Sequence, residues 1–250
     1  DRRRGQRPMR AVRSEWLKLV SVRSTWLLLG SMVLVEAAFA IGIAGYASLE
    51  DLRSGDVDQL FVGTPLLTVF VFTIGALLST NEFRHRTADS TFIVTPRRER
   101  VVVAKLAVGV AAGLVCALLF IAVNAGFGLS ILSNRGVPVD ADRALDIYVG
   151  VGVSLVLICV LGVALGALLR NQVVTIVLGI ALFFVLRELL TSILGEDIGA
   201  YLPGTSLLGL QGSSDDDYLL DQVAGGLVFA GYCVVVGIAA VIATREREIT

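Results

Sequence analysis

Few side chains in this sequence are placed for catalysis. His85 is the single histidine, and it has no nucleophile motif beside it. Cys116, Cys159 and Cys233 lie far apart inside apolar runs, which is typical of small buried hydrophobes rather than of a metal or redox site. The sequence has no G-x-x-x-x-G-K-[ST] or H-E-x-x-H motif and no pair of aspartates within an apolar run. We therefore expect no catalytic residue, no metal site and no cofactor bound by this chain.

The densest polar segment is the island at 81–100, which carries five arginines beside Phe92 and Ile93. Residues 86–94 are long enough for about two helical turns. Thr95-Pro96 ends this helix, because a residue before proline avoids the α conformation. Pro96 suits the first turn of a following helix, with Thr95 as its N-cap. The arginines either dock on a soluble partner or only fix topology beside lipid phosphates.

Glu36 is the one acid in the middle of an apolar run. An ionisable group at mid-membrane costs roughly 2.5–3.5 kcal/mol, so Glu36 should face protein or water rather than lipid. It is either a cavity or gating residue, or the acceptor of a structural hydrogen bond from a neighbouring span. Asn124 and Thr73 are its candidate partners, and Asn124 shares the candidate cavity or gating role. Arg187-Glu188 is interpreted as a local charge pair.

The elements that position these residues are membrane spans. Hydrophobic residues make up 55% of the chain, against about 45–50% in soluble domains, and mean hydropathy is +0.80. Backbone groups in lipid need partners within their own segment, so each apolar run is expected to be a helix. The sequence predicts an all-α polytopic membrane protein with six spans: Ser24–Tyr46, Phe61–Thr80, Val101–Ile131, Ile147–Leu169, Gln172–Leu186 (continuing to about Leu190) and Gln222–Thr244.

The basic residues predict the orientation. Of the 21 lysines and arginines, 17 fall on the side of the N-terminus, and Arg53, Arg135, Arg143 and Arg187 fall on the other side. Positive residues favour the cytoplasmic side. We expect a multi-pass protein of the plasma membrane with both termini in the cytoplasm.

Three further features complete the predicted architecture. Residues 1–8 are expected to be a disordered basic extension, and residues 9–250 a single transmembrane domain. Trp16 and Lys18 belong to a predicted amphipathic helix in the inner interface; the alternative is an ordinary positive flank of the first span. Small residues recur on span three (Gly109, Gly113, Ala117) and span four (Gly162, Gly166), for packing within the chain or for dimerisation.

The segment between spans five and six is too polar to span, yet it is rich in leucine and isoleucine. Pro203-Gly204 interrupts it, shortly after Tyr201. We expect an outer re-entrant segment of two short helices around this break, because irregular backbone at membrane depth must be shielded by protein.

Several of these motifs resemble those of ABC-2 type transporter permeases of the actinobacterial kind. The resemblance covers residues 9–250. Many relatives have glycine before the threonine in the second motif, where this chain has Arg86. The similar stretches are Arg13-Ser14-Glu15-Trp16-Leu17-Lys18-Leu19, Glu82-Phe83-Arg84-His85-Arg86-Thr87, Thr91-Phe92-Ile93-Val94-Thr95-Pro96-Arg97-Arg98, Lys105-Leu106 and Tyr201-Leu202-Pro203.

The resemblance implies an exporter subunit without ATPase activity of its own. Two copies of a separately encoded ABC ATPase would bind ATP and Mg, beside a second, identical or different, permease copy. The cargo would be amphipathic or hydrophobic, such as a lipid, a drug or a lipophilic peptide, and the partners would include membrane lipids but no nucleic acid. The implied cytoplasmic coupling helix between spans two and three contains Arg84, Arg86, Thr87, Thr91, Phe92, Ile93, Thr95 and Arg97.

Two other functions remain open from the residues alone. A non-transporting scaffold or sensor would use the arginine-rich island to recruit a cytoplasmic protein. A secondary transporter driven by an ion gradient would be expected to carry several charged residues along its spans, together with inverted repeats.

Overall fold

A computed structural model describes residues 13–49, 52, 56–84, 98–213 and 218–246. The described residues form helices and no strand, and six helical regions are long and apolar enough to cross a membrane. The prediction of an all-α polytopic membrane protein with six spans is confirmed. The spanning regions are Arg23–Tyr46, Val57–Asn81, Val101–Asn134, Ala141–Leu169, Gln172–Leu194 and Gln222–Arg245.

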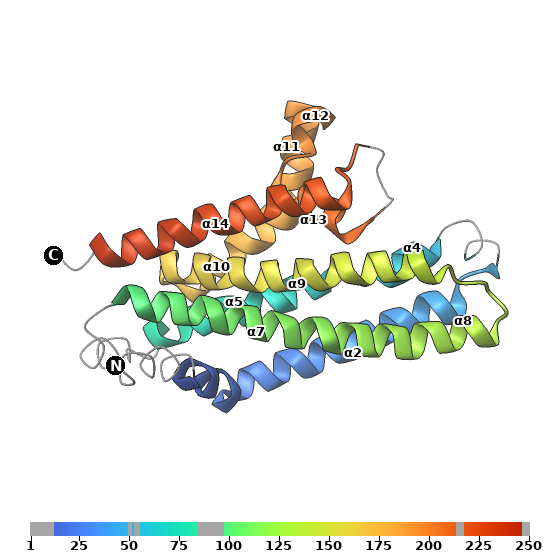
Figure 1. The fold of residues 1–250 in the computed structure, drawn as a ribbon, viewed down its shortest axis with the longest axis horizontal. Helices are drawn as coiled ribbons and strands as arrows, with labels where there is room; N and C mark the ends of the chain where they lie inside the picture. The colour runs from blue at the N-terminus through green and yellow to red at the C-terminus, as the bar shows by residue number, and fades with distance from the viewer. Residues whose placement is uncertain (1–12, 50–51, 53–55, 85–97, 214–217, 247–250) are drawn as a thin grey trace, which may run out of the picture.

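Several spans consist of more than one helical piece. The described elements are α2 (Arg23–Tyr46), α4 (Asp56–Val62), α5 (Leu66–Arg84), α7 (Arg98–Asn124), η1 (Ala125–Leu129), α8 (Ser130–Asn134), α9 (Ala141–Leu169), α10 (Gln172–Ile180), η2 (Ala181–Val185), α11 (Leu186–Leu194), α12 (Glu196–Gly199), α13 (Pro203–Gln211) and α14 (Gln222–Glu246). The two π-helical segments, η1 and η2, lie within spans three and five. In Figure 1 the first turns of α7 and the last turns of α14 lie at one end of the bundle, and α4 and α8 lie at the other.

Local sequence signals set the ends of α9 and α10. Asp140 caps α9 by accepting hydrogen bonds from the backbone N–H groups of Asp142 and Arg143, at 3.0 and 3.3 Å. The helix stops at Arg170, which adopts a left-handed conformation with φ 54°. Asn171 then caps α10 by accepting from the N–H of Val174 at 3.2 Å. Short polar side chains at N-caps replace partners that the first turn of a helix lacks.

Helix α9 lies at the centre of the bundle and packs against α5, α7 and α14. Small residues allow these close approaches. A Cβ atom on Gly113 of α7 would lie 2.6 Å from the Cα of Val156, and one on Gly162 of α9 would meet the backbone of Phe72 and Ala76. The small faces of spans three and four therefore serve packing within the chain, one of the two uses that the sequence left open.

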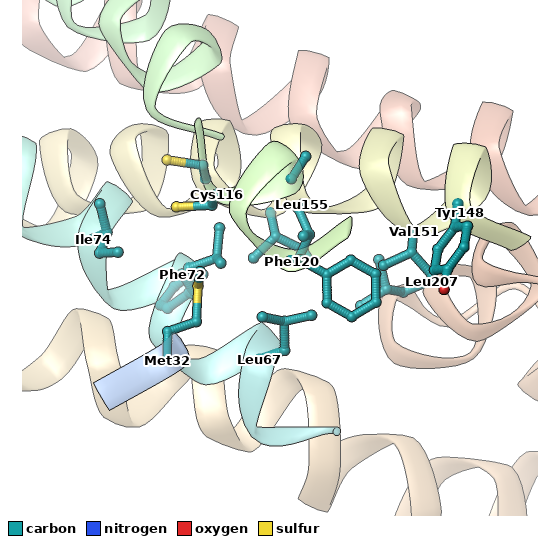
Figure 2. Packing of buried hydrophobic residues seen from close by; sticks show 14 of the residues in the cluster. Met32, Leu67, Phe72, Ile74, Cys116, Phe120, Tyr148, Val151, Leu155 and Leu207 are labelled. Carbon is teal, nitrogen blue, oxygen red and sulfur yellow. The ribbon is translucent and has the colours of Figure 1, made fainter. Parts of the chain in front are cut away.

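The hydrophobic core follows the contact of α5, α7 and α9. Phe72, Phe120 and Leu155 are fully buried and lie near one another in Figure 2. The rings of Phe120 and Tyr148 meet edge to face with centroids 6.2 Å apart, a geometry that aromatic pairs favour.

Span two differs from the single uninterrupted helix predicted over Phe61–Thr80. It is interrupted between α4 and α5 by Gly63, Thr64 and Pro65. Gly63 has φ +80°, which an L side chain rarely adopts. Pro65 lacks an N–H and disfavours the α conformation at Thr64. The apolar run was recognised from the sequence, but the break inside it was not.

Short helices follow span five around Pro203, as the sequence predicts. Pro203 occupies the first turn of α13, where its fixed φ suits helix initiation. Most of α13 is buried, and it packs against α14 and α9. This burial supplies the protein shielding on which the predicted re-entrant segment depends; its depth and side in the membrane stay a prediction.

Candidate functional site

The break in span two is held by two polar side chains from other spans. In an unbroken α-helix the carbonyl of Leu60 would accept from the N–H of Thr64. Here the N–H of Thr64 donates to Glu36 Oε2 at 3.3 Å, and Asn124 Nδ2 donates to the Leu60 carbonyl at 2.8 Å. Asn124 Nδ2 also donates to Glu36 Oε1 at 2.8 Å. Glu36 and Asn124 together replace the missing backbone hydrogen bond.

Tyr148 on α9 completes this network. Its hydroxyl donates to Asn124 Oδ1 at 2.9 Å, so the amide of Asn124 uses both its donor and its acceptor ends. Glu36 is 1% exposed and Asn124 is 0% exposed. Buried polar groups are costly unless they are paired, and this arrangement pairs both oxygens of Glu36. Four spans therefore meet at one buried polar cluster.

Gly63 fits closely against this cluster. A Cβ at this position would lie 2.6 Å from the ring of Phe120 and 3.1 Å from each carboxylate oxygen of Glu36. Both the positive φ and the lack of space therefore require glycine here.

A cavity of about 420 Å³ opens beside the break. Ligand sites in proteins usually measure about 300–1,000 Å³, so this volume suits a small molecule or part of a larger one. Residues of the break line the cavity together with residues of η2, α11 and α13. The apolar lining includes Phe39, Phe183, Phe184, Leu207 and Leu208, and the polar lining includes Asp58, Gln59, Thr64, Thr68, Arg187 and Gln211.

Two ion pairs border the cavity. Arg143 Nε donates to Asp58 Oδ2 at 3.1 Å, and another nitrogen of Arg143 donates to the carbonyl of Gly212. Arg187 pairs with Glu188 at 3.1 Å, which confirms the predicted charge pair. Arg187 also lines the cavity, a position that the sequence did not indicate. The wall thus combines an apolar surface with charged and amide groups.

A comparison with protein families decides the kind of protein that carries this site. The family model described as ABC-2 family transporter protein matches residues 11–186, more than half of the chain. The chain belongs to this family. A search of curated proteins finds no match to it. The matched region includes the Glu36 cluster and ends just before Arg187 and α13, which complete the cavity.

The chain is thus an ABC transporter permease, a membrane transport component, and the predicted family is confirmed. Permeases of this family normally work with an ABC ATPase. Among the described residues no cluster of histidine, cysteine, aspartate and glutamate could hold a metal ion.

The predicted site residues of this permease occupy different places. Glu36 and Asn124 are brought together, and Asn124 rather than Thr73 is the partner of Glu36. Thr73 instead lines a second hollow of about 360 Å³ with Ser24, Asn81 and Gln172. Glu36 does not itself line the larger cavity, although its partner Thr64 does. Its gating role stays a prediction.

The outer segment and the N-terminal helix are partly described. Gly204 lines the cavity, and the carbonyl of Tyr201 accepts a hydrogen bond from the hydroxyl of Tyr232 at 3.1 Å. Residues 13–21 are helical, with Trp16 half-buried against the core and Lys18 paired with Glu15 at 2.7 Å. The placement of this helix in the membrane interface stays a prediction.

The coupling residues fall largely outside the described part of the chain. Arg84 ends α5, but its side chain is not among those described. The coupling helix therefore stays a sequence prediction, as do the basic extension at 1–8 and the division into domains. The following predicted residues lie outside the described ranges: Arg86, Thr87, Thr91, Phe92, Ile93, Thr95 and Arg97.

Sequence reasoning missed the break, the cavity and the buried carboxylate of Glu15. Gly63 and Pro65 within an apolar run were the available signal for the break. No comparable signal marks Phe183 or Leu207, because an apolar residue that lines a cavity looks the same in sequence as one that faces lipid.

Proposed function

We propose that this ABC transporter permease exports an amphipathic or hydrophobic molecule, driven by ATP hydrolysis in a separate ATPase subunit. The observation that carries the proposal is the cavity beside the break in span two. Its volume of about 420 Å³ and its combination of phenylalanine and leucine with Arg187, Asp58 and amide groups match a molecule with one apolar and one polar part. A lipid, a drug or a lipophilic peptide fits this description.

The complete transporter would contain two permease copies and two ATPase subunits. ATP and Mg would bind to the ATPase, because the sequence of this chain has no P-loop motif. The segment 84–97 would contact the ATPase through its arginines together with Phe92 and Ile93, a mixture that suits a protein interface. The second permease copy is identical or different, and membrane lipids surround the pair.

The distribution of basic residues supports insertion in the plasma membrane with both termini in the cytoplasm. In this orientation segment 84–97 faces the cytoplasm, where ATP is available, and the cavity lies toward the outer side. Export is the direction that fits a cavity near the outer exit.

The test is reconstitution of the permease in proteoliposomes with a separately encoded ABC ATPase. ATP should drive accumulation of fluorescent lipid and lipophilic drug probes in inside-out vesicles. Leu208→Trp should reduce transport by partly filling the cavity that Leu208 lines, whereas Leu227→Trp on α14, which is 70% exposed, should not.

The outcomes separate the alternative functions. Transport that follows an ion gradient without ATP would indicate a secondary transporter. ATPase binding without transport of any probe would favour a scaffold or sensor. Equal transport by the two tryptophan variants would exclude the cavity as the substrate site.

A further inference from the structure

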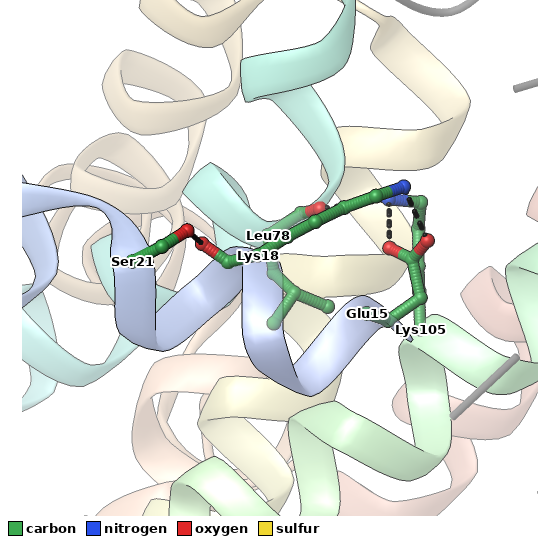
Figure 3. A network of polar contacts seen from close by, with 5 residues as sticks. All are labelled: Glu15, Lys18, Ser21, Leu78 and Lys105. Atoms are coloured by element: carbon green, nitrogen blue, oxygen red, sulfur yellow. Dashed lines mark hydrogen bonds and ion pairs between the residues drawn. The ribbon is translucent and has the colours of Figure 1, made fainter. Parts of the chain in front are cut away.

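A buried carboxylate lies far from the cavity, in the helix formed by residues 13–21. Glu15 is 5% exposed, and its two oxygens accept from two lysines. Lys105 Nζ donates to Glu15 Oε2 at 2.7 Å, and Lys18 Nζ donates to Oε1 at 2.7 Å. Lys105 Nζ also donates to the carbonyl of Leu78 at 3.0 Å. Figure 3 shows the three side chains converging on one point between the helices.

The ammonium group of Lys105 joins three segments of the chain. Leu78 lies about two turns before the end of α5, Lys105 lies about two turns after the start of α7, and Glu15 belongs to the N-terminal helix. Residues 85–97 connect α5 to α7 along the chain. A displacement applied to that connection therefore acts on two helices that Lys105 ties to each other and to Glu15.

The N-terminal helix continues this connection to α2. Only Val22 separates residues 13–21 from α2, and the indole nitrogen of Trp26 donates to the carbonyl of Val20 at 2.8 Å across the junction. Helix α2 carries Glu36, which holds the break in span two, and Phe39, which lines the cavity. The chain of contacts thus runs from Lys105 through Glu15 to the cavity wall.

The Glu15–Lys105 pair is buried, and this burial restricts how far the two side chains can shift relative to each other. Both side chains of the Glu15–Lys105 pair are 5% exposed, whereas Lys18 is 42% exposed. Two charges removed from water are stable only in close, well-aligned contact, so the pair resists sliding in a way that apolar packing does not.

We propose that Glu15 and Lys105 are positioning residues for energy coupling, which make the N-terminal helix and α2 move with the ends of α5 and α7 that flank residues 85–97. This inference rests on the proposed function, in which an ATPase acts on that connection. When the ATPase displaces residues 85–97, the ion pair makes the N-terminal helix and α2 move as well. The movement of α2 then shifts the break in span two and the cavity wall. Neither residue contacts the substrate.

The experiment compares variants in the reconstituted complex of permease and ATPase. Glu15→Leu combined with Lys105→Met removes both charges of the pair together, so that neither is left buried without the other. Replacing a buried ion pair by apolar residues is often tolerated in stability, so the thermal unfolding midpoint should stay near that of the wild type. Transport per ATP hydrolysed should fall about fivefold or more, the lower range of coupling between distant sites.

Ser79→Ala is the matched control. Ser79 follows Leu78 in the chain and donates to the carbonyl of Val163 at 2.8 Å, so the variant removes a buried tie between α5 and α9 without affecting the N-terminal helix. It should keep the wild-type ratio of transport to ATP hydrolysis.

Wild-type transport per ATP in the stable double variant would overturn the inference and leave the pair a purely structural role. If the double variant unfolds, Glu15→Gln provides the comparison, since it keeps the shape and removes the charge. A wild-type ratio in Glu15→Gln would also overturn the inference. Absence of ATP-driven transport in the wild-type complex would instead refute the proposed function.

Discussion

Glu36 and Asn124 are 88 residues apart in the chain, and their side chains meet at 2.8 Å where span two is interrupted. Each satisfies one of the two backbone groups that the break leaves without its helical partner. Intramembrane polar residues usually pair with one another or with backbone groups, and they often mark functional positions. The geometry shows the structural role of Glu36, which accepts from Asn124 and from Thr64, and Thr64 lines the cavity. A gating role for Glu36 stays a prediction.

Glu36→Gln should preserve assembly but weaken the network. The amide nitrogen of glutamine cannot accept from Thr64 N–H or Asn124 Nδ2, so one of the two hydrogen bonds is lost. A donor left without its partner in a buried site costs about 1–3 kcal/mol. Thermal unfolding of the purified permease should show the lower stability, and proteoliposome assays should show altered transport. Unchanged transport and ATPase stimulation for a range of substrates would leave Glu36 a structural role only.

Tyr148→Phe should be milder than Asn124→Leu. The first variant removes one hydrogen bond to Asn124, and such bonds between membrane helices average about 0.6 kcal/mol. The second leaves Glu36 Oε1 and the Leu60 carbonyl without a donor, and it should cost several times as much. Chemical unfolding of both variants in the same detergent measures the difference. Equal losses would show that the amide of Asn124 does not hold the break.

Gly63→Ala should destabilise the permease and impair transport. The left-handed conformation alone costs an L residue about 1–2 kcal/mol, and the new Cβ would also press against Phe120. Gly231→Ala on α14 is the control, because a Cβ there meets nothing within 4 Å. Alanine in a helix interior should be neutral or stabilise by roughly 0.5–1 kcal/mol. Similar unfolding midpoints for the two variants would argue against the strained break.

Phe92→Asp should uncouple the permease from its ATPase. The prediction comes from the sequence of segment 84–97, where an apolar anchor stands among arginines. Insertion and dimerisation should persist, while co-purification of the ATPase and ATP-driven transport should fall sharply. Arg97→Ala should be milder, since an exposed charge contributes under about 1 kcal/mol. Full ATPase binding together with full transport by Phe92→Asp would leave the segment a topology signal only.

The orientation is testable with one cysteine. The native thiols Cys116, Cys159 and Cys233 are buried and can be replaced to give a cysteine-free background. Ser90→Cys should then react with a membrane-impermeant maleimide only after the cells are permeabilised, and Pro203→Cys should be tested beside it for labelling from outside. Labelling of residue 90 in intact cells would reverse the predicted topology.

The amino-acid sequence is enough to predict the spans, their helical character and the family. Backbone groups in hydrocarbon have no water to bond, so an apolar run of sufficient length must be a helix whatever surrounds it. A capping side chain or a fixed φ acts within one turn, so local chemistry sets the helix ends at Asp140, Asn171 and Pro203. Of these three, only the break at Pro203 is predicted from the sequence. The cost of a charge in lipid sufficed to predict that Glu36 needs a partner.

The identity of that partner depends on how the helices pack. Asn124 and Thr73 are both polar residues inside spans, and no local rule distinguishes them; the packing of α2, α5, α7 and α9 places one of them 2.8 Å from Glu36. The cavity and the Glu15–Lys105 pair depend in the same way on contacts between residues distant in sequence. Local sequence sets the backbone conformation and the depth of each helix, whereas the rotation and pairing of helices are set by side-chain packing across the whole bundle.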